Sequence, residues 1–303
     1  MSKLKIILTV GISCSGKTTW TNEFIKNRDD WVDLNRDEYR FFLFNNGVRD
    51  WSKYKFNRAN EKKVTDMINH SLPECVKQNK NIIISDTNLN PKYVEKWKLW
   101  AEENDYEFSI KEFPITYDEA LKRDNARAGG VGHTVLWSQW LKWLELTNYD
   151  FYKPDTSKQK AFIVDIDGTI AKVDGRGFFD WDKVGTDKPR KEIIEMVSGL
   201  IESGLTLIFL SGRDGSCIEE TYDWIMRELM FDFIPEDGGF HLFMRTAGDN
   251  RKDAIIKKEL FDEYIRNNFN IVAALDDRPC MSRLWNQMKI PNVITVADPL
   301  LEF

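Results

Sequence analysis

The eight residues GISCSGKT at positions 11–18 restrict the fold of this chain more than any other stretch. They match the phosphate-binding pattern G-x-x-x-x-G-K-[ST] throughout, with an apolar run before them and a helical pattern after. The glycines let backbone N–H groups curl around an anion, and the amino end of the helix adds positive partial charge. A strand, this loop and a helix predict a parallel sheet that binds a phosphate at its carboxyl edge. The alternative is a plain glycine turn.

A second loop at the end of an apolar run, DIDGT at 165–169, indicates a second domain. A chain of 303 residues is long enough for two domains that each bury a core. The polar stretch between the two halves carries one proline and no apolar period. We therefore expect a first domain at 1–148, a linker at 149–160 and a second domain at 161–303.

Both halves alternate short apolar strands with helical stretches, which predicts two α/β domains, each a doubly wound parallel sheet. Strands are predicted at Lys5–Val10, Trp31–Leu34, Asn81–Ser85, Glu107–Pro114, Ala161–Asp165, Thr206–Ser211 and Ile271–Leu275. Helices are predicted at Lys17–Lys26, Asp37–Asn45, Ala59–Gln78, Pro91–Asn104 with Asn90 as its cap, Tyr117–Ala128, Thr134–Leu146, Lys188–Glu202 and Glu219–Met230.

Charge and composition exclude several classes of protein. The net charge is −6, made up of +1 for residues 1–156 and −7 for the remainder, so a polynucleotide would bind locally at a small basic site. The four cysteines (14, 75, 217 and 280) and three histidines are scattered, which argues against a zinc site or disulfides and favours a reducing cytoplasm. The apolar runs are strand-length, so we expect neither a membrane span nor a signal peptide.

The first loop is expected to bind ATP with Mg²⁺. Lys17 would reach the β- and γ-phosphates and Thr18 would ligate the metal. The phosphates would be surrounded by Gly11, Ser13, Cys14, Ser15, Gly16, Lys17, Thr18 and Thr19.

The stretch NRDEYR at 35–40 follows a short predicted strand and suggests the acceptor side of a kinase. A carboxylate there can accept the proton of an attacking hydroxyl, and Asp37 is the candidate. Arg40 lies one helical turn on and would face the same cleft. The alternative is an Asp that caps the helix beside an exposed Arg.

Two further stretches of the first half suggest phosphate and metal contacts. Apolar residues end in Asp86, as in strands whose carboxylate binds Mg²⁺, and Thr87 and Asn88 follow at the same edge. Arg123 and Arg127 are expected to share a helix face before a mobile glycine lid. A strand-ending turn and a solvated basic helix end are the respective alternatives.

The DIDGT loop suggests phosphate removal through a covalent intermediate. Asp165 can attack phosphorus, and Asp167 can protonate the leaving oxygen and then activate water. The alternatives are a fragment of a calcium loop and a strand-end turn. Two later strands and the stretch KDAIIK carry further phosphate and Mg²⁺ candidates: Ser211 and Arg213 in LSGR, Lys257 in KDAIIK, and Asp276 and Asp277 in LDDR. This order resembles the haloacid dehalogenase (HAD) superfamily, and the DxD pair favours a phosphatase.

The chain as a whole resembles the bacteriophage polynucleotide kinase/phosphatase family, in the same domain order. The resemblance is carried by GISCSGKT, NRDEYR, IISDTNLNP, KRDNAR, VDIDGTIAK with GRG at 175–177, LSGR, RKDAIIK and LDDR. It implies a P-loop kinase that phosphorylates 5′-hydroxyl ends of RNA or DNA, and a HAD-like phosphatase that removes 3′-phosphates and 2′,3′-cyclic phosphates. It also implies homotetramers, a partner RNA ligase that seals cleaved tRNA, and the cytoplasm of an infected host cell.

The resemblance further implies roles for individual residues. Asp37 would be the general base, Arg40 would hold the acceptor's 3′-phosphate, and Arg127, with Arg123, would act on the ATP phosphates. In the second domain, Asp165 would be the nucleophile and Asp167 the acid/base. The phosphate would be surrounded by Arg176, Ser211, Arg213, Asp253 and Lys257, and the metal by Asp165, Asp167, Asp276 and Asp277.

Two aromatic stretches stand outside the resemblance. The segment 41–63 interleaves Trp51, Tyr54 and Phe56 with basic residues, a mixture that can grip a strand end. A solvated helix with apolar core contacts is the other interpretation. The run WSQWLKW at 137–143 is read as helical core packing or as a subunit or interdomain contact.

The sequence therefore predicts a bifunctional 5′-polynucleotide kinase and 3′-phosphatase. Two rival functions remain open. One is a small-molecule kinase fused to a small-molecule phosphatase, and the other is a scaffold that binds nucleotide and nucleic acid without turnover. The sequence does not rank RNA over DNA.

Overall fold

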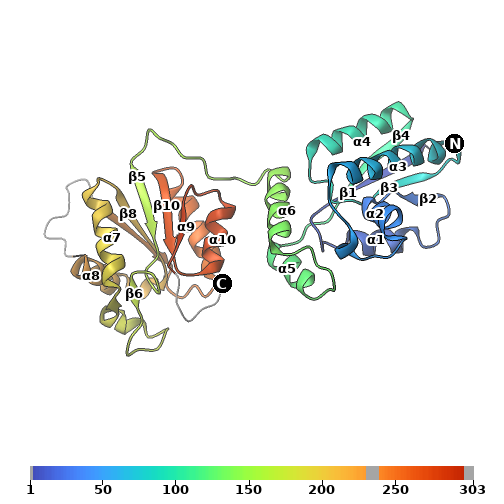
Figure 1. The fold of residues 1–303 in the computed structure, drawn as a ribbon. Coiled ribbons are helices and arrows are strands. Elements are labelled where there is room, and N and C mark those ends of the chain that lie inside the picture. The colour runs from blue at the N-terminus through green and yellow to red at the C-terminus, as the bar shows by residue number, and fades with distance from the viewer. Residues whose placement is uncertain (1–2, 230–238, 297–303) are drawn as a thin grey trace. The chain divides into compact units, whose positions relative to one another are not determined.

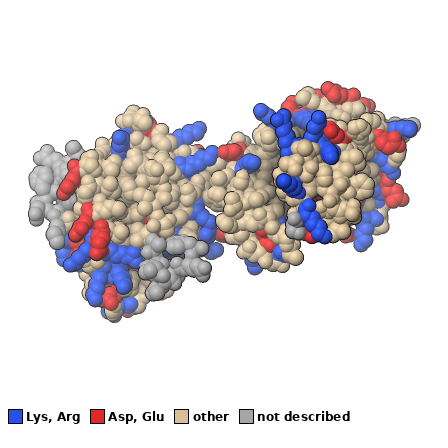
Figure 2. Space-filling view, in the orientation of Figure 1, with Lys and Arg blue, Asp and Glu red and all other residues tan. Residues whose placement is uncertain are grey.

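The computed structural model describes residues 3–229 and 239–296 of the chain. It forms two compact units, 1–149 and 150–303 (Figure 1). Each unit carries Lys and Arg side chains interspersed with Asp and Glu on the face drawn in Figure 2. Among the described residues, no helix combines the length and the apolar character that crossing a membrane requires.

The first unit contains a four-stranded parallel sheet of order β2-β3-β1-β4. Its strands are β1 (Leu4–Val10), β2 (Trp31–Asp33), β3 (Asn81–Ile84) and β4 (Tyr106–Glu112). The central strands β1 and β3 are apolar on both faces because helices cover the sheet on each side. The parallel sheet predicted for this half is confirmed, with strand ends within two residues of those expected.

Six α-helices and a 3₁₀ turn complete the first unit. They are α1 (Lys17–Ile25), α2 (Arg36–Asn45), η1 (Trp51–Lys53), α3 (Arg58–Lys77), α4 (Pro91–Glu103), α5 (Tyr117–Asn125) and α6 (His133–Leu146). Asn90 caps α4 as expected, with its side chain accepting from the backbone N–H of Lys92. The helix expected to reach Ala128 ends instead at Asn125, so Arg127 lies beyond the helix.

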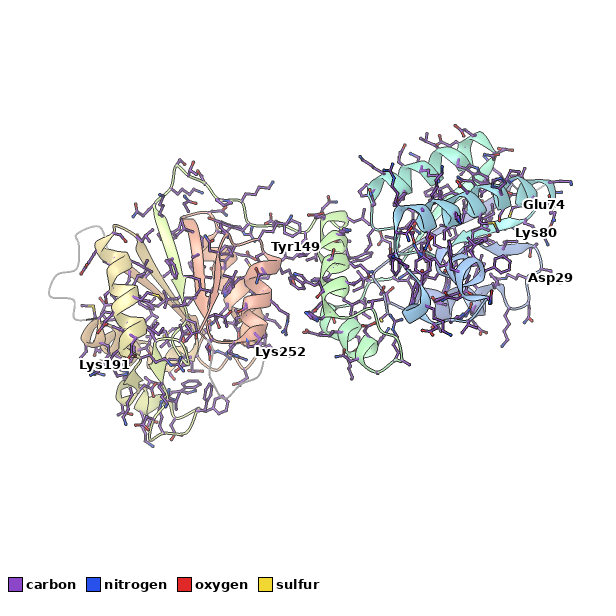
Figure 3. The ribbon with its side chains drawn as sticks, in the orientation of Figure 1. Asp29, Glu74, Lys80, Tyr149, Lys191 and Lys252 are labelled. Carbon is purple, nitrogen blue, oxygen red and sulfur yellow. The ribbon has the colours of Figure 1, made fainter. Side chains whose placement is uncertain are left out.

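Polar contacts close the amino edge of this sheet, near the labelled residues Asp29 and Lys80 in Figure 3. Lys80 donates from its ammonium to the backbone carbonyl of Asp29, and its own carbonyl accepts from the Tyr106 hydroxyl at 2.9 Å. The loops that carry the predicted site residues lie at the opposite, carboxyl edge of the sheet.

The second unit contains a five-stranded parallel sheet of order β11-β10-β5-β8-β9. Its strands are β5 (Lys160–Val164), β8 (Thr206–Asp214), β9 (Phe240–Arg245), β10 (Asn270–Asp276) and β11 (Val293–Thr295). Side chains alternate between two cores: Val164 and Phe209 pack toward α7 (Lys191–Glu202), whereas Ile163 and Leu210 pack toward α10 (Pro279–Gln287). Figure 1 shows α7 and α10 on opposite sides of this sheet.

Seven further elements complete the described part of this unit. They are β6 (Ala171–Lys172), η2 (Trp181–Thr186), β7 (Lys188–Pro189), η3 (Gly215–Cys217), α8 (Ile218–Glu228), α9 (Asp253–Leu260) and η4 (Phe261–Ile265). Lys188 was expected to begin a helix, but it lies in β7, which pairs with β6. Pro189 explains the difference, because a residue before proline avoids the helical conformation. Met230, the expected end of α8, lies outside the described residues.

Candidate active sites

A cavity of about 730 Å³ opens at the carboxyl edge of the first sheet. It brings together most of the residues that the sequence assigned to ATP and to the acceptor. Those that line it are Ser13, Cys14, Gly16, Lys17, Thr18, Thr19, Asp37, Arg40, Asp86, Thr87, Arg123 and Arg127. Gly11, Ser15 and Asn88 do not line it.

The loop before α1 has the backbone that its glycines predict. Gly16 adopts φ +97° at the start of α1, a conformation that costs a residue with a Cβ atom about 1 kcal/mol or more. A Cβ atom on Gly11 would lie 2.9 Å from the carbonyl oxygen of Phe113, so the loop packs directly against the end of β4. Cys14 has φ +65°, which turns the loop between the two glycines.

Lys17 is buried and folded back onto its own loop. Its ammonium donates to the carbonyl oxygens of Gly11 at 2.9 Å and Ile12 at 2.6 Å. Burial lowers the pKa of Lys17 to about 8, against the opposing effect of nearby acidic groups. A triphosphate in the cavity offers the negative charge that this desolvated ammonium lacks.

Asp37 and Arg40 form an ion pair at the first turn of α2. Asn35, not Asp37, caps this helix, because its side chain accepts from the backbone N–H groups of Asp37 and Glu38. The Asp37 carboxylate is therefore left to face the cavity, with about half of its side chain exposed (49%). The cap by Asn35 excludes the alternative of a capping aspartate, and the acceptor-side role of the pair stays a prediction.

Glu61 of α3 fixes that pair, and sequence reasoning missed it. It accepts from Arg40 at 2.9 and 2.7 Å and from Arg36 at 2.8 Å. The Arg40 hydrogen bond lowers the pKa of Glu61 to about 2 against the effect of burial, and Arg36 and Tyr54 contribute further hydrogen bonds. No local pattern links Arg40 to Glu61, because 21 residues and a loop separate them.

Asp86 and Thr87 follow β3 and lie in the cavity, whereas Asn88 turns inward. The Asp86 carboxylate accepts from the backbone N–H of Arg36 at 3.0 Å, and burial raises its pKa to about 7. The Asn88 amide donates to the carbonyls of Thr9 and Ile84 inside the protein, at 2.8 and 3.2 Å. Asn88 thus shapes the turn rather than the cavity wall.

Asp124 organises the arginine-bearing segment, and it too was missed. Its buried carboxylate accepts from the Arg127 guanidinium at 2.8 Å, from the backbone N–H groups of Val131 and Gly132, and from the Cys14 thiol at 3.3 Å. Arg123 donates to the Cys14 carbonyl at 3.2 Å. The two arginines therefore line the cavity from a helix and from the turn after it, not from one helix face as expected.

The second unit gathers its charged residues where β5, β8 and β10 end. Asp165 is buried and accepts from Lys257 at 2.5 Å and from the Thr169 hydroxyl at 3.0 Å. Lys257 also donates to Asp276 at 3.0 Å. Burial raises the pKa of Asp165, and the charge of Asp276 adds to this effect while that of Lys257 opposes it.

Asp167 faces two arginines rather than the other carboxylates. Arg213 donates to both of its oxygens, at 2.9 and 2.8 Å, and the Arg176 guanidinium lies 3.5 Å away. Both arginines also pair at 2.7 Å with Asp187, a fully buried residue that the sequence did not single out. Asp187 therefore positions the two arginines beside Asp167. It directly follows η2, and no sequence pattern marks it as a site residue.

Three of the four carboxylates expected at the second unit's metal lie together. Single oxygens of Asp165, Asp276 and Asp277 lie within 4.8 Å of one another, while Asp167 is not part of this cluster. One buried oxygen of Asp277 has no hydrogen-bond partner among the described residues, and burial raises the pKa of Asp277 to about 6. Crowded, desolvated carboxylates with an unsatisfied oxygen suit a hard cation such as Mg²⁺.

Ser211 and Asp253 support this site from β8 and α9. Ser211 is fully buried, and its hydroxyl accepts from the backbone N–H of Arg213 at 3.2 Å. Asp253 accepts from Arg245 at 3.2 Å and from Arg278 at 2.9 Å. A Cβ atom on Gly212 would lie 1.9 Å from the Asp253 carboxylate, so only glycine allows this approach.

Comparison with known proteins identifies the two domain types. Residues 6–146 match the family model of the AAA domain, and residues 159–299 match that of the polynucleotide kinase PNKP phosphatase domain, a HAD-type domain. The predicted fold class, a P-loop kinase domain followed by a HAD-like phosphatase domain, is confirmed.

One curated relative aligns with the whole chain. It is the "Putative bifunctional polynucleotide kinase/RNA ligase" of Autographa californica nuclear polyhedrosis virus, 33% identical over 315 residues. The alignment covers 100% of this chain and 44% of the relative, so the chain spans less than half of that protein.

Two solved structures are also similar. A chain in the structure of the Pnkp1/Rnl/Hen1 RNA repair complex is 25% identical with a TM-score of 0.43, over 99% of this chain and 98% of that one. A second structure of the Pnkp1/Rnl/Hen1 complex gives 26% identity and a TM-score of 0.43, over 98% and 97% of the two chains.

Proposed function

Because the chain joins an AAA-type P-loop kinase domain to a phosphatase domain of the polynucleotide kinase type, we propose that it heals broken polynucleotide ends. The first unit transfers the γ-phosphate of ATP to 5′-hydroxyl ends of RNA or DNA. The second unit hydrolyses 3′-phosphate and 2′,3′-cyclic phosphate ends. The observation that carries the proposal is that the phosphate-binding loop and the Asp37–Arg40 pair share one cavity.

In the kinase step, Asp37 accepts the proton of the 5′-hydroxyl while the hydroxyl oxygen attacks the γ-phosphorus. The bond between the γ-phosphorus and the departing ADP breaks. Arg40 holds the acceptor's 3′-phosphate, and Glu61 keeps Arg40 in place. Lys17, Arg123 and Arg127 contact the ATP phosphates, which requires Lys17 to leave the carbonyls of its own loop.

Thr18 and Asp86 are the residues that would hold Mg²⁺ in the kinase cavity, and both line it. The ion would neutralise charge on the β- and γ-phosphates. Thr87 adds a hydroxyl for substrate at the same edge.

In the phosphatase step, a carboxylate oxygen of Asp165 attacks phosphorus, and Asp167 donates a proton to the leaving 3′-oxygen. Asp167 then takes a proton from water, whose oxygen attacks the phosphorus of the aspartyl-phosphate and releases inorganic phosphate. Arg176, Arg213 and Lys257 supply positive charge around the transferred group. Ser211 of β8 accepts from the backbone N–H of Arg213, and Asp253 of α9 lies 3.9 Å from the Lys257 ammonium, so both help to position this set.

The residues of the second unit that would hold Mg²⁺ are Asp165, Asp276 and Asp277. The metal would offset the mutual repulsion of these carboxylates and that between Asp165 and the incoming phosphate.

The decisive experiment is an assay on cleaved tRNA that bears 5′-hydroxyl and 2′,3′-cyclic phosphate ends. We expect transfer of label from γ-labelled ATP to the 5′ end and loss of the phosphate from the 3′ end. Activity on free nucleosides or sugars alone would establish the small-molecule rival instead. Binding of ATP and RNA without turnover of either would establish a scaffold.

Healed ends require a strand-joining activity, so we propose an RNA ligase as the functional partner. The name of the viral relative combines a polynucleotide kinase with an RNA ligase, and this chain aligns with less than half of that relative. A bacteriophage source, a host-cell location and a homotetramer remain predictions from the resemblance. Sedimentation of the purified chain would test the tetramer.

A further inference from the structure

We infer that Trp51 and Phe56 form a stacking platform in the kinase cavity, on which the terminal nucleobase of the acceptor strand lies. The inference rests on the proposed kinase function and names the part of the acceptor that the cavity recognises. It concerns the segment between α2 and α3, for which neither the P-loop nor the Asp37–Arg40 pair gives a role.

The two rings stack on each other, and the Phe56 ring is accessible. Both side chains line the same cavity as Lys17 and Asp37. Their ring centroids lie 5.7 Å apart with planes inclined by only 16°, and the Phe56 residue is 63% exposed. An exposed aromatic ring at the wall of a polar cavity is available to a planar ligand.

Buried aromatic residues pack against both rings of the platform. Phe41 of α2 packs against Trp51 with a centroid separation of 4.6 Å, and Tyr54 meets Phe56 edge to face at 4.7 Å. Phe41 and Tyr54 are 5% and 6% exposed, so they are core residues. The expected interpretation of segment 41–63 as apolar core contact therefore accounts for Phe41 and Tyr54 but leaves Phe56 unexplained.

The platform is joined to the cation that would hold the acceptor's phosphate. The Tyr54 hydroxyl donates to Glu61 at 2.8 Å, and Glu61 is the residue that anchors Arg40. The Arg40 guanidinium carbon lies 5.6 Å from the centre of the Phe56 ring. A base on Phe56 and a phosphate on Arg40 would therefore be neighbouring parts of one nucleotide.

Stacking on aromatic rings tolerates any base, because every base has a π-face. The platform therefore selects a base that is free of its complement rather than a particular sequence. We expect the kinase to favour single-stranded or overhanging 5′-hydroxyl ends over recessed ends, where the terminal base is paired.

The test compares Phe56→Ala with Phe42→Ala on a single-stranded 5′-hydroxyl oligonucleotide. Phe42 is the matched control, because it is 66% exposed on α2 and does not line the cavity. Each protein is also assayed on the same oligonucleotide with an abasic first nucleotide. Phe56→Ala should raise KM for the intact acceptor by about 5- to 100-fold and leave KM for ATP unchanged.

The abasic acceptor should show a similar rise with the unchanged protein and little further rise with Phe56→Ala. Phe56→Trp should retain the low KM. The platform is overturned if Phe56→Ala behaves as Phe42→Ala does, if KM for ATP rises equally, or if removal of the first base has no effect. Failure of the proposed function is a separate result, in which the unchanged protein labels no oligonucleotide at all.

Discussion

At the level of single residues, the kinase cavity separates the group that would take a proton from the group that would hold a phosphate. Glu61, with its pKa lowered to about 2, stays ionised at any ordinary pH and keeps Arg40 paired. Asp37 contacts Arg40 but is half-exposed, so its carboxylate can meet a hydroxyl of the acceptor. The same turn of α2 thus presents one anion and one cation to the cavity.

Asp37→Asn should lower kcat for 5′-phosphorylation by about 10²- to 10⁴-fold, because an amide cannot accept the hydroxyl proton. KM for ATP should stay within about twofold, since the role proposed for Asp37 concerns the acceptor and not ATP. Steady-state kinetics with varied ATP and varied oligonucleotide measure both quantities. Collapse of ATP binding would remove Asp37 from the role of acceptor-side base.

Sequence reasoning reached Asp37 and Arg40 because they lie three positions apart in one helix, a local spacing. It did not reach Glu61, Asp124 or Asp187, which hold the predicted residues from other segments. Each is an ordinary acidic residue in its own neighbourhood, and it becomes a partner only when the chain folds. The supporting contacts of a site are therefore less visible in a sequence than its reactive groups.

At the level of elements, the ends of the strands position the charged side chains. Some of these side chains are buried there at a cost in stability. Asp33 ends β2, and its carboxylate accepts from the Ser85 hydroxyl at 2.8 Å. The other oxygen has no partner among the described residues. Burial raises the pKa of Asp33 to about 6, against the opposing hydrogen bonds from Ser85.

Asp33→Asn should stabilise the first unit at pH 7. The folded-state pKa lies above the unfolded value, so the native protein binds the extra proton and loses stability as pH rises from about 4 to about 6. The neutral amide removes that loss, which is worth about 1–3 kcal/mol at pH 7 and close to nothing at pH 4. Urea unfolding of both proteins across this range measures the difference, and a less stable variant at pH 7 would contradict the assignment.

Asp187→Ala should destabilise the second unit by about 3–5 kcal/mol, because it removes the fully buried carboxylate that pairs with both Arg176 and Arg213 and leaves them only the partly exposed Asp167. Denaturant unfolding monitored by circular dichroism measures the loss. Asp182→Ala is the control, since Asp182 is exposed on neighbouring η2. Equal effects of the two substitutions would show that Asp187 does not hold the arginine pair.

The predicted helices and strands are present because apolar periodicity marks such elements in a sequence, whereas β9, β11, α9 and α10 were not predicted. Three predicted boundaries were wrong by three residues: the end of α5, the start of α7 and the end of β8. Arg127 lies in the turn that follows α5, since Asp124 accepts from the backbone of residues 131 and 132 and bends the chain there. A Cβ atom on Gly130 would lie 2.7 Å from that carboxylate, which explains why glycine occurs at this position. Periodicity carries no information on such a bend.

At the level of the whole molecule, the two sets of reactive residues belong to different compact units with separate cores. All residues that line the first cavity lie before 140, and the clustered carboxylates of the second unit lie after 164. The two proposed activities therefore share a chain but no side chain.

Lys17→Ala should lower kinase turnover at least about 100-fold and leave 3′-phosphate release within about twofold. Asp165→Asn should do the reverse, because an amide cannot form the aspartyl-phosphate. Assays of both activities on each folded variant check this. Joint loss in either variant would contradict separate sites, and surviving phosphatase activity in Asp165→Asn would remove Asp165 as nucleophile.

The single carboxylate of Asp124 has a mechanical consequence. It is tied at once to the Cys14 thiol, the Arg127 guanidinium and the backbone of residues 131 and 132. The phosphate-binding loop and the arginine segment are therefore connected through one shared carboxylate. A displacement of the loop on filling of the cavity would be transmitted to Arg127 even before Arg127 touches what has entered.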